Sequence, residues 1–593
     1  MQTSDGQISQ QGVEFVDAQR EFETWLNHAQ LPDDVRNELE HLKGNPDAVN
    51  DCFGKTLEFG TGGMRGLMGV GPNRLNIFTI RRATFALAQF LMQTVADAKT
   101  RGVAIGYDCR HHSRTFAQEA GLTLAALGIR AMVAPVLCPT PEVSFAIRHL
   151  RAAGGIMITA SHNPPQYNGY KAYGPAGYQL LPEDTNRIHE LMMQQEDVFA
   201  LPTLPLADAE QKGLFQWWDN ALTERYVRSV VQSVASPAVT SEDRRNLTVV
   251  YTPLHGAGNR PVRQALEQAG YKHVHVVAEQ EQPDGDFPTV KSPNPEEHSA
   301  LRLGIEAARA RDADLVLGTD PDSDRAGIAV RTRHGTYELL SGNQVGALLI
   351  DFLLSRRKET RTLPANGVVF KTVVTSDLGA VIAASYGVAA ENVLTGFKYI
   401  GHGATVYEQT GAHTFLFGFE ESYGYLISPI VRDKDAVQAC LAIADMAAWY
   451  KRRGATLIDA LHHLFARHGW FAERLVTVPL NAGEGAKEVE RVMDGLRKQV
   501  PTVPDLNLSA VEDYLTSERR TLGKRSGQDA VDPLSLPRSN VLKYIFEDES
   551  WMAIRPSGTE PKIKVYLAAR GVNETECETK LQVMQDAMER HLQ

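Results

Sequence analysis

The sequence predicts an α/β protein of four domains, and three observations support this prediction. The chain has 593 residues, which at about 150 residues per domain indicates roughly four domains. Short β-like runs alternate with segments whose apolar residues keep helical spacing, as is typical of α/β layers. Three β-rich runs that each enter a polar turn, at 103–110, 247–256 and 368–378, suggest similar domains in tandem. Because any α/β protein repeats a strand followed by a polar turn, the runs alone leave both explanations open.

Individual elements follow from the same patterns. In the first domain, buried strands are expected at 103–107, 131–136 and 155–159, with helices between them. The end of the chain has strand patterns at 541–546, 551–555 and 563–568 and then a helix to Gln593, which indicates a smaller α+β domain. The polar and charged stretch 516–539 is expected to lie exposed.

Composition and charge exclude several classes of partner. The formal net charge of −11 argues against a nucleic-acid or anionic-membrane partner. Positive charge for an acidic substrate must therefore be concentrated locally. The five cysteines lie far apart, and the polar start lacks a signal-peptide core, so we expect a cytoplasmic protein. No apolar run approaches the 18 or so residues that a membrane span needs.

The first chemical motif is the loop Thr159–Pro165, which directly follows an apolar strand. A serine at the end of a buried strand lies at the rim of an α/β sheet, where ligands usually bind. The two prolines stiffen the loop, His162 can exchange protons, and Lys171 supplies a cation near the same rim. These residues fit a reactive Ser161, and they also fit a plain turn with an exposed serine.

The second motif is the acidic loop Asp320–Arg325, which also follows an apolar strand. Carboxylates at Asp320, Asp322 and Asp324 can converge on one point, where unpaired charges would repel one another by several kcal/mol. A hard divalent cation relieves this repulsion, and an all-oxygen ligand set suits magnesium. The alternative is a solvated acidic turn.

Two further loops contain residues that suit a sugar phosphate. Gly418–Tyr425 combines paired carboxylates with a serine and glycines, which suit hydrogen bonds to sugar hydroxyls. Arg555–Lys564 offers a guanidinium fork, two hydroxyl donors and a glycine, which suit a phosphate group. A turn and a surface hairpin with mixed charges are the alternatives for these two loops.

Together the four loops resemble the α-D-phosphohexomutase superfamily, whose members include phosphoglucomutases and phosphomannomutases. Thr159–Pro164 resembles its serine loop, Asp320–Arg325 its metal loop, Glu420–Ser422 the sugar-binding loop of its phosphoglucomutases, and Arg555–Thr559 its phosphate loop. The matches run in order from about Gly60 to Tyr566. The glycine-rich Gly60–Gly66 and the stretch Arg432–Ala436 resemble the longer branch, which holds bacterial α-phosphoglucomutases and relatives that act on pentose phosphates.

The resemblance implies a heart-shaped enzyme in which four domains surround one cleft. Three would be related α/β domains with mixed sheets and the last a smaller α+β domain. We expect them at 1–215, 216–335, 336–468 and 469–593, carrying in turn the phosphoserine, metal, sugar-binding and phosphate-binding loops.

The resemblance also implies a set of site residues. Mg²⁺ would be held by Asp320, Asp322, Asp324 and a phosphate oxygen on Ser161. The cleft would be lined by Arg65, Lys171, Arg325, Thr395, Gly396, Lys398 and Lys434. Glu420 and Ser422 would bind sugar hydroxyls. The phosphate that is not reacting would be held by Arg555, Ser557, Gly558, Thr559 and Lys564.

The implied reaction interconverts α-D-glucose 1-phosphate and glucose 6-phosphate through phosphoserine and glucose 1,6-bisphosphate. Some members have a histidine shortly after the sugar-binding loop, where this chain has Tyr423–Tyr425, so His162 and Lys171 are the candidates for the general base. Alternatives are a pentose or mannose phosphate as substrate, an aspartyl phosphate at Asp320, and a sugar-phosphate sensor without catalysis.

Overall fold

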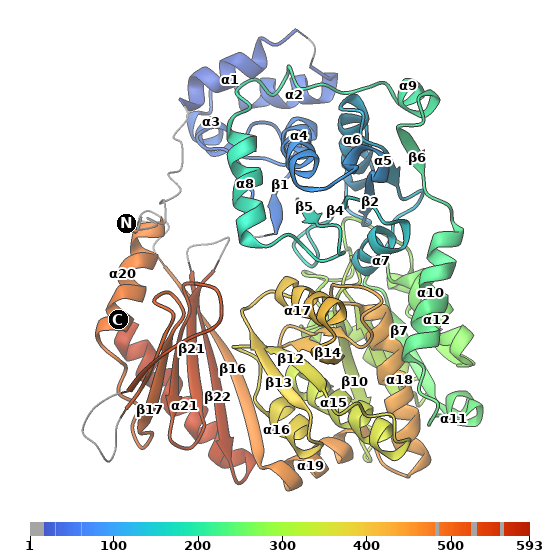
Figure 1. Ribbon diagram of the computed structural model, residues 1–593, viewed down its shortest axis with the longest axis vertical. Helices are drawn as coiled ribbons and strands as arrows, with labels where there is room; N and C mark the ends of the chain where they lie inside the picture. Colours follow the sequence, from blue (N-terminus) through green and yellow to red (C-terminus); the bar gives the residue numbers. More distant parts are fainter. Residues whose placement is uncertain are drawn as a thin grey trace.

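The computed structural model describes residues 17–592 except 30, 61, 481–484, 523–529 and 558–561. It contains four β-sheets, each with helices packed on it, in four successive units of the chain (Figure 1). Three short helices precede the first unit: α1 (Ala18–Leu26), α2 (Asp33–Leu42) and α3 (Pro46–Phe53). The α/β fold and the four-unit architecture predicted from the sequence are confirmed.

The first unit is built on a six-stranded mixed sheet of order β1-β5-β4-β2-β3-β6. The strands are β1 (Gly63–Leu67), β2 (Val103–Tyr107), β3 (Ala131–Val133), β4 (Gly154–Ile158), β5 (Tyr167–Tyr173) and β6 (Phe215–Trp217). The helices are α4 (Ile77–Thr94), α5 (Ala98–Arg101), α6 (Ser113–Ala126), α7 (Thr140–Leu150), α8 (Pro182–Met193) and α9 (Leu206–Gln211). Asn76 begins α4 with a capping box that satisfies free N–H groups of the first turn.

The second and third units have smaller mixed sheets. The second contains β7 (Thr248–Thr252), β8 (His273–Val276), β9 (Leu315–Thr319), β10 (Ala326–Arg331) and β11 (Tyr337–Leu340), with α10 (Ala221–Val234), α11 (Ser241–Asn246), α12 (Asn259–Ala269), α13 (Ala278–Glu281) and α14 (His298–Arg309). The third contains β12 (Gly367–Thr372), β13 (Ala389–Val393), β14 (Thr414–Glu420) and β15 (Gly424–Leu426), with α15 (Gly342–Glu359), α16 (Leu378–Ser385), α17 (Lys398–Thr410), α18 (Ala436–Arg452) and α19 (Leu457–His468).

The three units repeat one arrangement of four strands. Its orders are β5-β4-β2-β3, β10-β9-β7-β8 and β15-β14-β12-β13. In each unit, the three strands that come first along the chain are parallel to one another. The fourth along the chain lies at the edge of this arrangement and runs antiparallel to the third. The runs that suggested a repeat in the sequence fall on β2, β7 and β12, which are the equivalent first strands.

The fourth unit is an antiparallel sheet of order β16-β22-β21-β20-β17-β18-β19. Its strands are β16 (Trp470–Pro479), β17 (Leu508–Asp513), β18 (Glu518–Thr521), β19 (Ala530–Pro533), β20 (Leu542–Phe546), β21 (Trp551–Pro556) and β22 (Lys562–Gly571), with helices α20 (Gly485–Lys498) and α21 (Glu574–Leu592). Every residue of β18 and β19 is exposed, as expected for the stretch 516–539. The exact division of the chain into domains stays a prediction.

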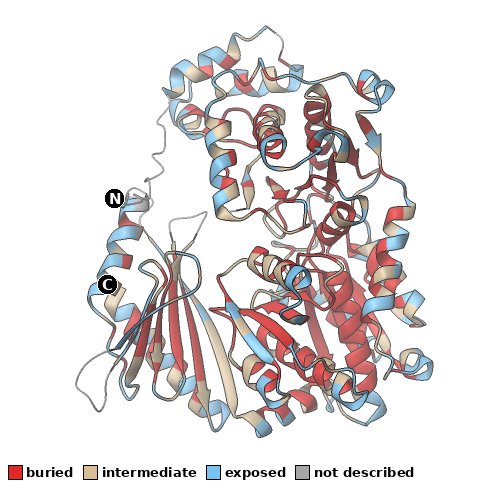
Figure 2. Ribbon diagram, in the orientation of Figure 1, coloured by how far each residue is buried: buried red, intermediate tan, exposed pale blue. Residues whose placement is uncertain are grey.

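The hydrophobic core is continuous across the first three units, whereas the fourth has a core of its own. Buried residues are concentrated along the strands of the sheets and on helices beside them (Figure 2). Ile105, Leu317 and Phe417, one from each of the first three sheets, belong to the shared core. The fourth unit docks on the third through a small cluster that joins Val373 to Trp551. In the described residues no helix is long and apolar enough to cross a membrane.

Candidate active site

A cleft of about 720 Å³ lies where the first three units meet, and this volume is typical of small-molecule sites. Ten of the residues singled out in the sequence line it: Arg65, Ser161, Lys171, Asp324, Arg325, Thr395, Gly396, Lys398, Glu420 and Lys434. The repeat explains this convergence. Ser161 lies in the β4–β5 connection, Asp320–Arg325 forms the β9–β10 connection, and Glu420 ends β14 before β15, so equivalent hairpins of three units meet at one place.

Ser161 is buried and lies in a left-handed backbone conformation with φ of 52°. Its Oγ donates a hydrogen bond to Oδ2 of Asp320 over 2.6 Å. Its backbone N–H donates to the Thr159 hydroxyl, 2.8 Å away. His162 Nδ1 lies 3.3 Å from the same Oγ. The serine is therefore fixed against the acidic loop of the second unit and does not project from an exposed turn.

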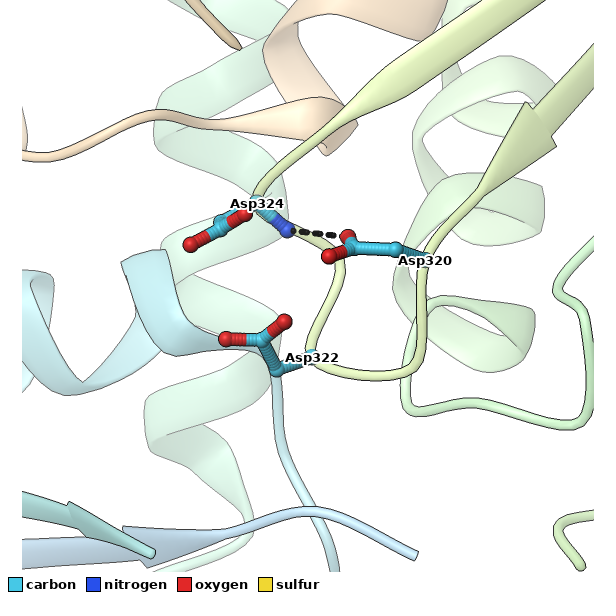
Figure 3. A group of neighbouring side chains, drawn as sticks. All are labelled: Asp320, Asp322 and Asp324. Atoms are coloured by element: carbon cyan, nitrogen blue, oxygen red, sulfur yellow. Dashed lines mark hydrogen bonds between the residues drawn. The ribbon is translucent and has the colours of Figure 1, made fainter. Parts of the chain in front are cut away.

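The three aspartates of the acidic loop face one another (Figure 3). One carboxylate oxygen from each lies within 4.8 Å of the other two, and all three residues are at most 1% exposed. Oδ1 of Asp322 and Oδ1 of Asp324 have no hydrogen-bond partner among the described residues. Buried carboxylate oxygens without partners are costly. The donor set therefore fits a hard divalent cation, which would satisfy them.

Two lysines approach the same carboxylates from other units. Lys171 on β5 donates to Oδ2 of Asp322 at 2.7 Å and to Oδ2 of Asp324 at 3.0 Å. Lys434 Nζ lies 3.3 Å from Oδ2 of Asp324 and 3.8 Å from Oε1 of Glu420. Burial alone would raise the pKa of Asp322, but Lys171 holds that pKa below its ordinary value. Burial raises the pKa of Glu420, and Lys434 opposes this shift.

Two arginines line the cleft beside the lysines. Arg325 Nη1 donates to Oε1 of Glu296 at 2.5 Å, and its backbone N–H donates to Oδ1 of Asp320 at 3.0 Å. Arg65 on β1 donates to Oδ1 of Asn163 in the serine loop at 2.9 Å. The net negative chain thus gathers lysines and arginines at this cleft, which is where an anionic substrate needs them. In total, seven such residues in the described part of the chain line the cleft: Lys55, Arg65, Arg74, Lys171, Arg325, Lys398 and Lys434.

The third unit contributes the turn before α17 and the end of β14. Gly396 has a φ of 120°, a conformation that glycine adopts readily. Thr395 Oγ1 is buried without a hydrogen-bond partner among the described residues, so it is available to a ligand. Burial lowers the pKa of Lys398 to about 8. Ser422 lies in the β14–β15 turn, outside the set of described residues that line the cleft.

Of the predicted phosphate loop of the fourth unit, the described residues Arg555, Ser557 and Lys564 are not among those that line this cleft. Arg555 is the penultimate residue of β21 and pairs in register with Lys564 on β22. Nη2 of Arg555 donates to the Tyr566 hydroxyl at 3.0 Å. Ser557 follows β21, and Gly558 and Thr559 lie outside the described residues. A role for this loop stays a prediction.

Several residues of the site were missed in the sequence. Thr140, at the start of α7, donates through its hydroxyl to Oδ2 of Asp322 at 2.6 Å. Asp433 accepts from the Tyr173 hydroxyl and from Gln179 Nε2, both at 2.9 Å. Asp108 and Arg110 support the serine loop from the end of β2. Asp108 and Arg110 could have been found in the sequence, because two opposite charges follow directly after a buried strand. No local sequence pattern marks Thr140 as a site residue.

Protein-family models match the chain over most of its length. The models are the phosphoglucomutase/phosphomannomutase α/β/α domains I, II and III, at residues 56–198, 224–335 and 341–468, and the C-terminal domain, at 476–578. These matches cover the four units in order. The fold and the site together thus indicate the class of phosphosugar mutases.

Curated relatives agree with the family models. A phosphoglucomutase of Staphylococcus epidermidis is 39% identical over 514 residues, which are 86% of this chain and 90% of the relative. One of Staphylococcus aureus is 36% identical over 536 residues, covering 90% and 93%. The chain therefore belongs to the phosphoglucomutase/phosphomannomutase family, within the α-D-phosphohexomutase superfamily that its motifs indicate.

Solved structures share the fold. A family member from Burkholderia thailandensis superposes with a TM-score of 0.64 at 17% identity, covering 90% of this chain and 97% of the other. Parafusin, a phosphoglucomutase of Paramecium in an open form, gives a TM-score of 0.61 at 16% identity, covering 90% and 94%. At such identities the likeness extends to the fold alone.

Proposed function

We propose that the protein is a phosphoglucomutase, which interconverts α-D-glucose 1-phosphate and glucose 6-phosphate with Ser161 as the phosphoryl carrier. The observation that carries the proposal is the Ser161 hydroxyl, 2.6 Å from Asp320 in a cleft lined by lysines and arginines. Positioned cations that neutralise a transferring phosphoryl group are the main requirement of phosphoryl-transfer catalysis. The curated relatives, named phosphoglucomutases, support glucose as the sugar.

The acidic loop is the proposed Mg²⁺ site, with Asp320, Asp322 and Asp324 as its protein ligands. Their buried, partly unpaired oxygens fit this ion. Bound there, the ion would supply positive charge beside the phosphoryl group that Ser161 carries. Lys171, which already bonds two of these carboxylates, keeps a second positive charge at the same place.

The reaction begins with Ser161 phosphorylated and a sugar monophosphate in the cleft. The free sugar hydroxyl attacks phosphorus, a new P–O bond to the sugar forms, and the P–O bond to Ser161 Oγ breaks. The hydroxyl proton passes to a base, for which His162 and Lys171 were the candidates in the sequence. Burial opposes the charge of Lys171, but Asp322 and Asp324, which accept its hydrogen bonds, raise its pKa and keep it protonated, so we assign the proton to His162. Glucose 1,6-bisphosphate then reverses its orientation and returns its other phosphoryl group to Ser161, so the enzyme ends as it began.

The remaining predicted residues hold the substrate. Arg65, Arg325, Thr395, Gly396, Lys398 and Lys434 face the cleft, and Glu420 with Ser422 is proposed to bind the sugar hydroxyls. The phosphate that is not reacting is assigned to the fourth unit, to Arg555, Ser557, Gly558, Thr559 and Lys564. The guanidinium fork of Arg555 suits that dianion.

An aspartyl phosphate at Asp320 is disfavoured by the contacts of that residue. Its Oδ1 accepts from the backbone N–H groups of Asp324 and Arg325, at 3.1 and 3.0 Å. Its Oδ2 accepts from Ser161 at 2.6 Å. Attack by this buried carboxylate would break hydrogen bonds to a charged group, which are worth about 1.5–3 kcal/mol each.

A coupled assay tests the proposed activity. With Mg²⁺, glucose 1-phosphate and a trace of glucose 1,6-bisphosphate, the protein should produce glucose 6-phosphate, and Asp322→Asn should reduce this production strongly. Brisk turnover of ribose 1-phosphate or mannose 1-phosphate without glucose 6-phosphate would reject the glucose assignment. Binding of all these sugars without any turnover would instead identify a sensor.

A further inference from the structure

The guanidinium of Arg110 donates hydrogen bonds to four backbone carbonyls, three in the serine loop and one at the start of β5. Nη1 donates to Pro164 O at 2.8 Å and to Tyr167 O at 3.0 Å. Nη2 donates to Ser161 O at 2.6 Å and to Asn163 O. Arg110 is 3% exposed, so these bonds are shielded from water. Without them, the buried Ser161 carbonyl and three part-buried carbonyls would lose this partner, which is costly.

Asp108 holds this arginine and extends the network to the serine itself. Its Oδ2 lies 3.4 Å from Arg110 Nε and accepts from the Thr159 hydroxyl at 2.6 Å. Thr159 Oγ1 in turn accepts from the N–H of Ser161 at 2.8 Å. Both sides of Ser161 are thus tied to one buried ion pair, its N–H through Thr159 and its carbonyl through Arg110.

The pair also joins the serine loop to the unit that carries the acidic loop. The Arg110 guanidinium lies over the Phe287 ring of the second unit, 4.9 Å from its centroid. Next to it, His111 Nε2 lies 2.7 Å from Oδ1 of Asp286. Arg110 is therefore placed between the nucleophile's loop and the body of the second unit.

We propose that Arg110, oriented by Asp108, is a positioning residue that sets the Ser161 backbone and so points its Oγ at the acidic loop. The inference rests on the proposed function, because it concerns transfer to and from Ser161. A left-handed φ at a non-glycine residue is unfavourable, and the bonds to Ser161 N–H and C=O hold it there. Arginine is required because it directs five N–H donors in a fixed plane, whereas lysine has three on a flexible stem.

The test compares Arg110→Lys with Arg244→Lys. Arg244 is a matched control, since it is also largely buried, pairs with a buried aspartate (Asp445, 2.8 Å) and donates to a carbonyl (Ser236 O, 3.0 Å), but lies away from the cleft. Rapid-quench labelling measures phosphoryl transfer from glucose 1,6-bisphosphate to dephosphorylated Ser161 in the presence of Mg²⁺. Thermal melts and the KM for glucose 1-phosphate are measured alongside.

We expect Arg110→Lys to slow phosphoryl transfer about 100-fold, the effect of misplacing a reacting group by about 1 Å, while KM changes less than about 3-fold. Arg244→Lys should lower the melting temperature without slowing transfer. In Arg110→Ala, added guanidinium chloride at non-denaturing concentration should restore part of the rate. If Arg110→Ala fails to fold, the two lysine variants still decide the matter.

Two results would overturn the inference. One is a transfer rate in Arg110→Lys within about 3-fold of wild type, and the other is an equal slowing in Arg244→Lys, which would assign Arg110 a merely structural role. Failure of the wild type itself to be labelled would reject the proposed function, and the inference with it. Labelled wild type with unimpaired Arg110→Lys would reject the inference alone.

Discussion

The buried charged side chains of this cleft form ion pairs with one another. Lys171 and Lys434 approach Asp324 from the first and third units, and Arg325 pairs with Glu296. Removing one partner from a buried pair costs about 3–5 kcal/mol, because the other is left uncompensated. A phosphorylated substrate adds negative charge to the cleft and a divalent cation adds positive charge, so both alter the electrostatic interactions of these ion pairs. The charge state of each lysine is therefore part of the affinity of the cleft for a sugar phosphate.

Lys398 should give this affinity an upper pH limit. Burial lowers its pKa to about 8, so the side chain is positive below that pH and loses its charge above it. Since kcat/KM reports the free enzyme, it should fall by about tenfold per pH unit above pH 8. The sugar phosphate is already a dianion in this range, so the lysine is the group that changes.

The variant Lys398→Arg separates this cause from others, because arginine stays charged at these pH values. Its kcat/KM should stay flat to about pH 10. A pH profile for Lys398→Arg that falls in parallel with the wild type would show that another group limits activity.

At the scale of elements, pairs of strands set the geometry of the site. Strands β1 and β5 pair antiparallel, with Gly63 opposite Lys171 and Arg65 opposite Gly169. The register therefore fixes Arg65 and Lys171 relative to each other. Gly63 allows the close pairing, because a Cβ there would lie 1.8 Å from Tyr170 O.

Gly63→Ala should destabilise the protein by about 3 kcal/mol and reduce kcat/KM, since β1 must move away from β5. Gly44→Ala is the control, because Gly44 also has a positive φ of 78° but its Cβ would meet nothing within 4 Å. Gly44→Ala should cost about 1 kcal/mol and leave activity unchanged. Chemical denaturation and steady-state kinetics measure both effects, and equal losses in the two variants would contradict the argument.

The local sequence predicted what lies within one loop or strand. The alternation of buried runs placed β2 at Val103–Tyr107, as found, and the i, i+2, i+4 spacing predicted the acidic cluster. Thr140 and Asp433 escaped prediction, because each meets its partner across more than 180 residues of chain. The sequence predicted that 516–539 is exposed, but it did not predict that this stretch contains the strands β18 and β19, of which β19 is the edge of the sheet.

At the scale of the whole molecule, a threefold repeat concentrates chemistry that no unit possesses alone. Equivalent hairpins supply the serine, the acidic loop and Glu420. The loop 432–435 of the third unit contacts both of the other units. Asp433 bonds Tyr173 and Gln179 of the first unit, and the next residue, Lys434, reaches Asp324 of the second. The three-unit resemblance was visible in the sequence, but the contacts that align the units were not.

Asp433→Asn should therefore weaken the site by loosening Lys434. The amide keeps one acceptor oxygen, whereas the carboxylate now serves two donors at Oδ2 and the Lys434 N–H at Oδ1. We expect a loss of about 1–3 kcal/mol in unfolding free energy and a fall of about tenfold or more in kcat/KM. Tyr173→Phe removes one donor and should give a smaller change of the same kind. Unchanged kinetics in Asp433→Asn would contradict the coupling.

The central claim is that Ser161 carries the phosphoryl group, and the most direct measurement is to locate that group. The protein is treated with Mg²⁺ and labelled glucose 1,6-bisphosphate, and the label is mapped by peptide mass spectrometry after acid or hydroxylamine. We expect one acid-stable, hydroxylamine-resistant phosphate on Ser161. The variant Ser161→Ala should show neither label nor turnover. A hydroxylamine-labile label on the loop Asp320–Arg325, or wild-type turnover by Ser161→Ala, would contradict it.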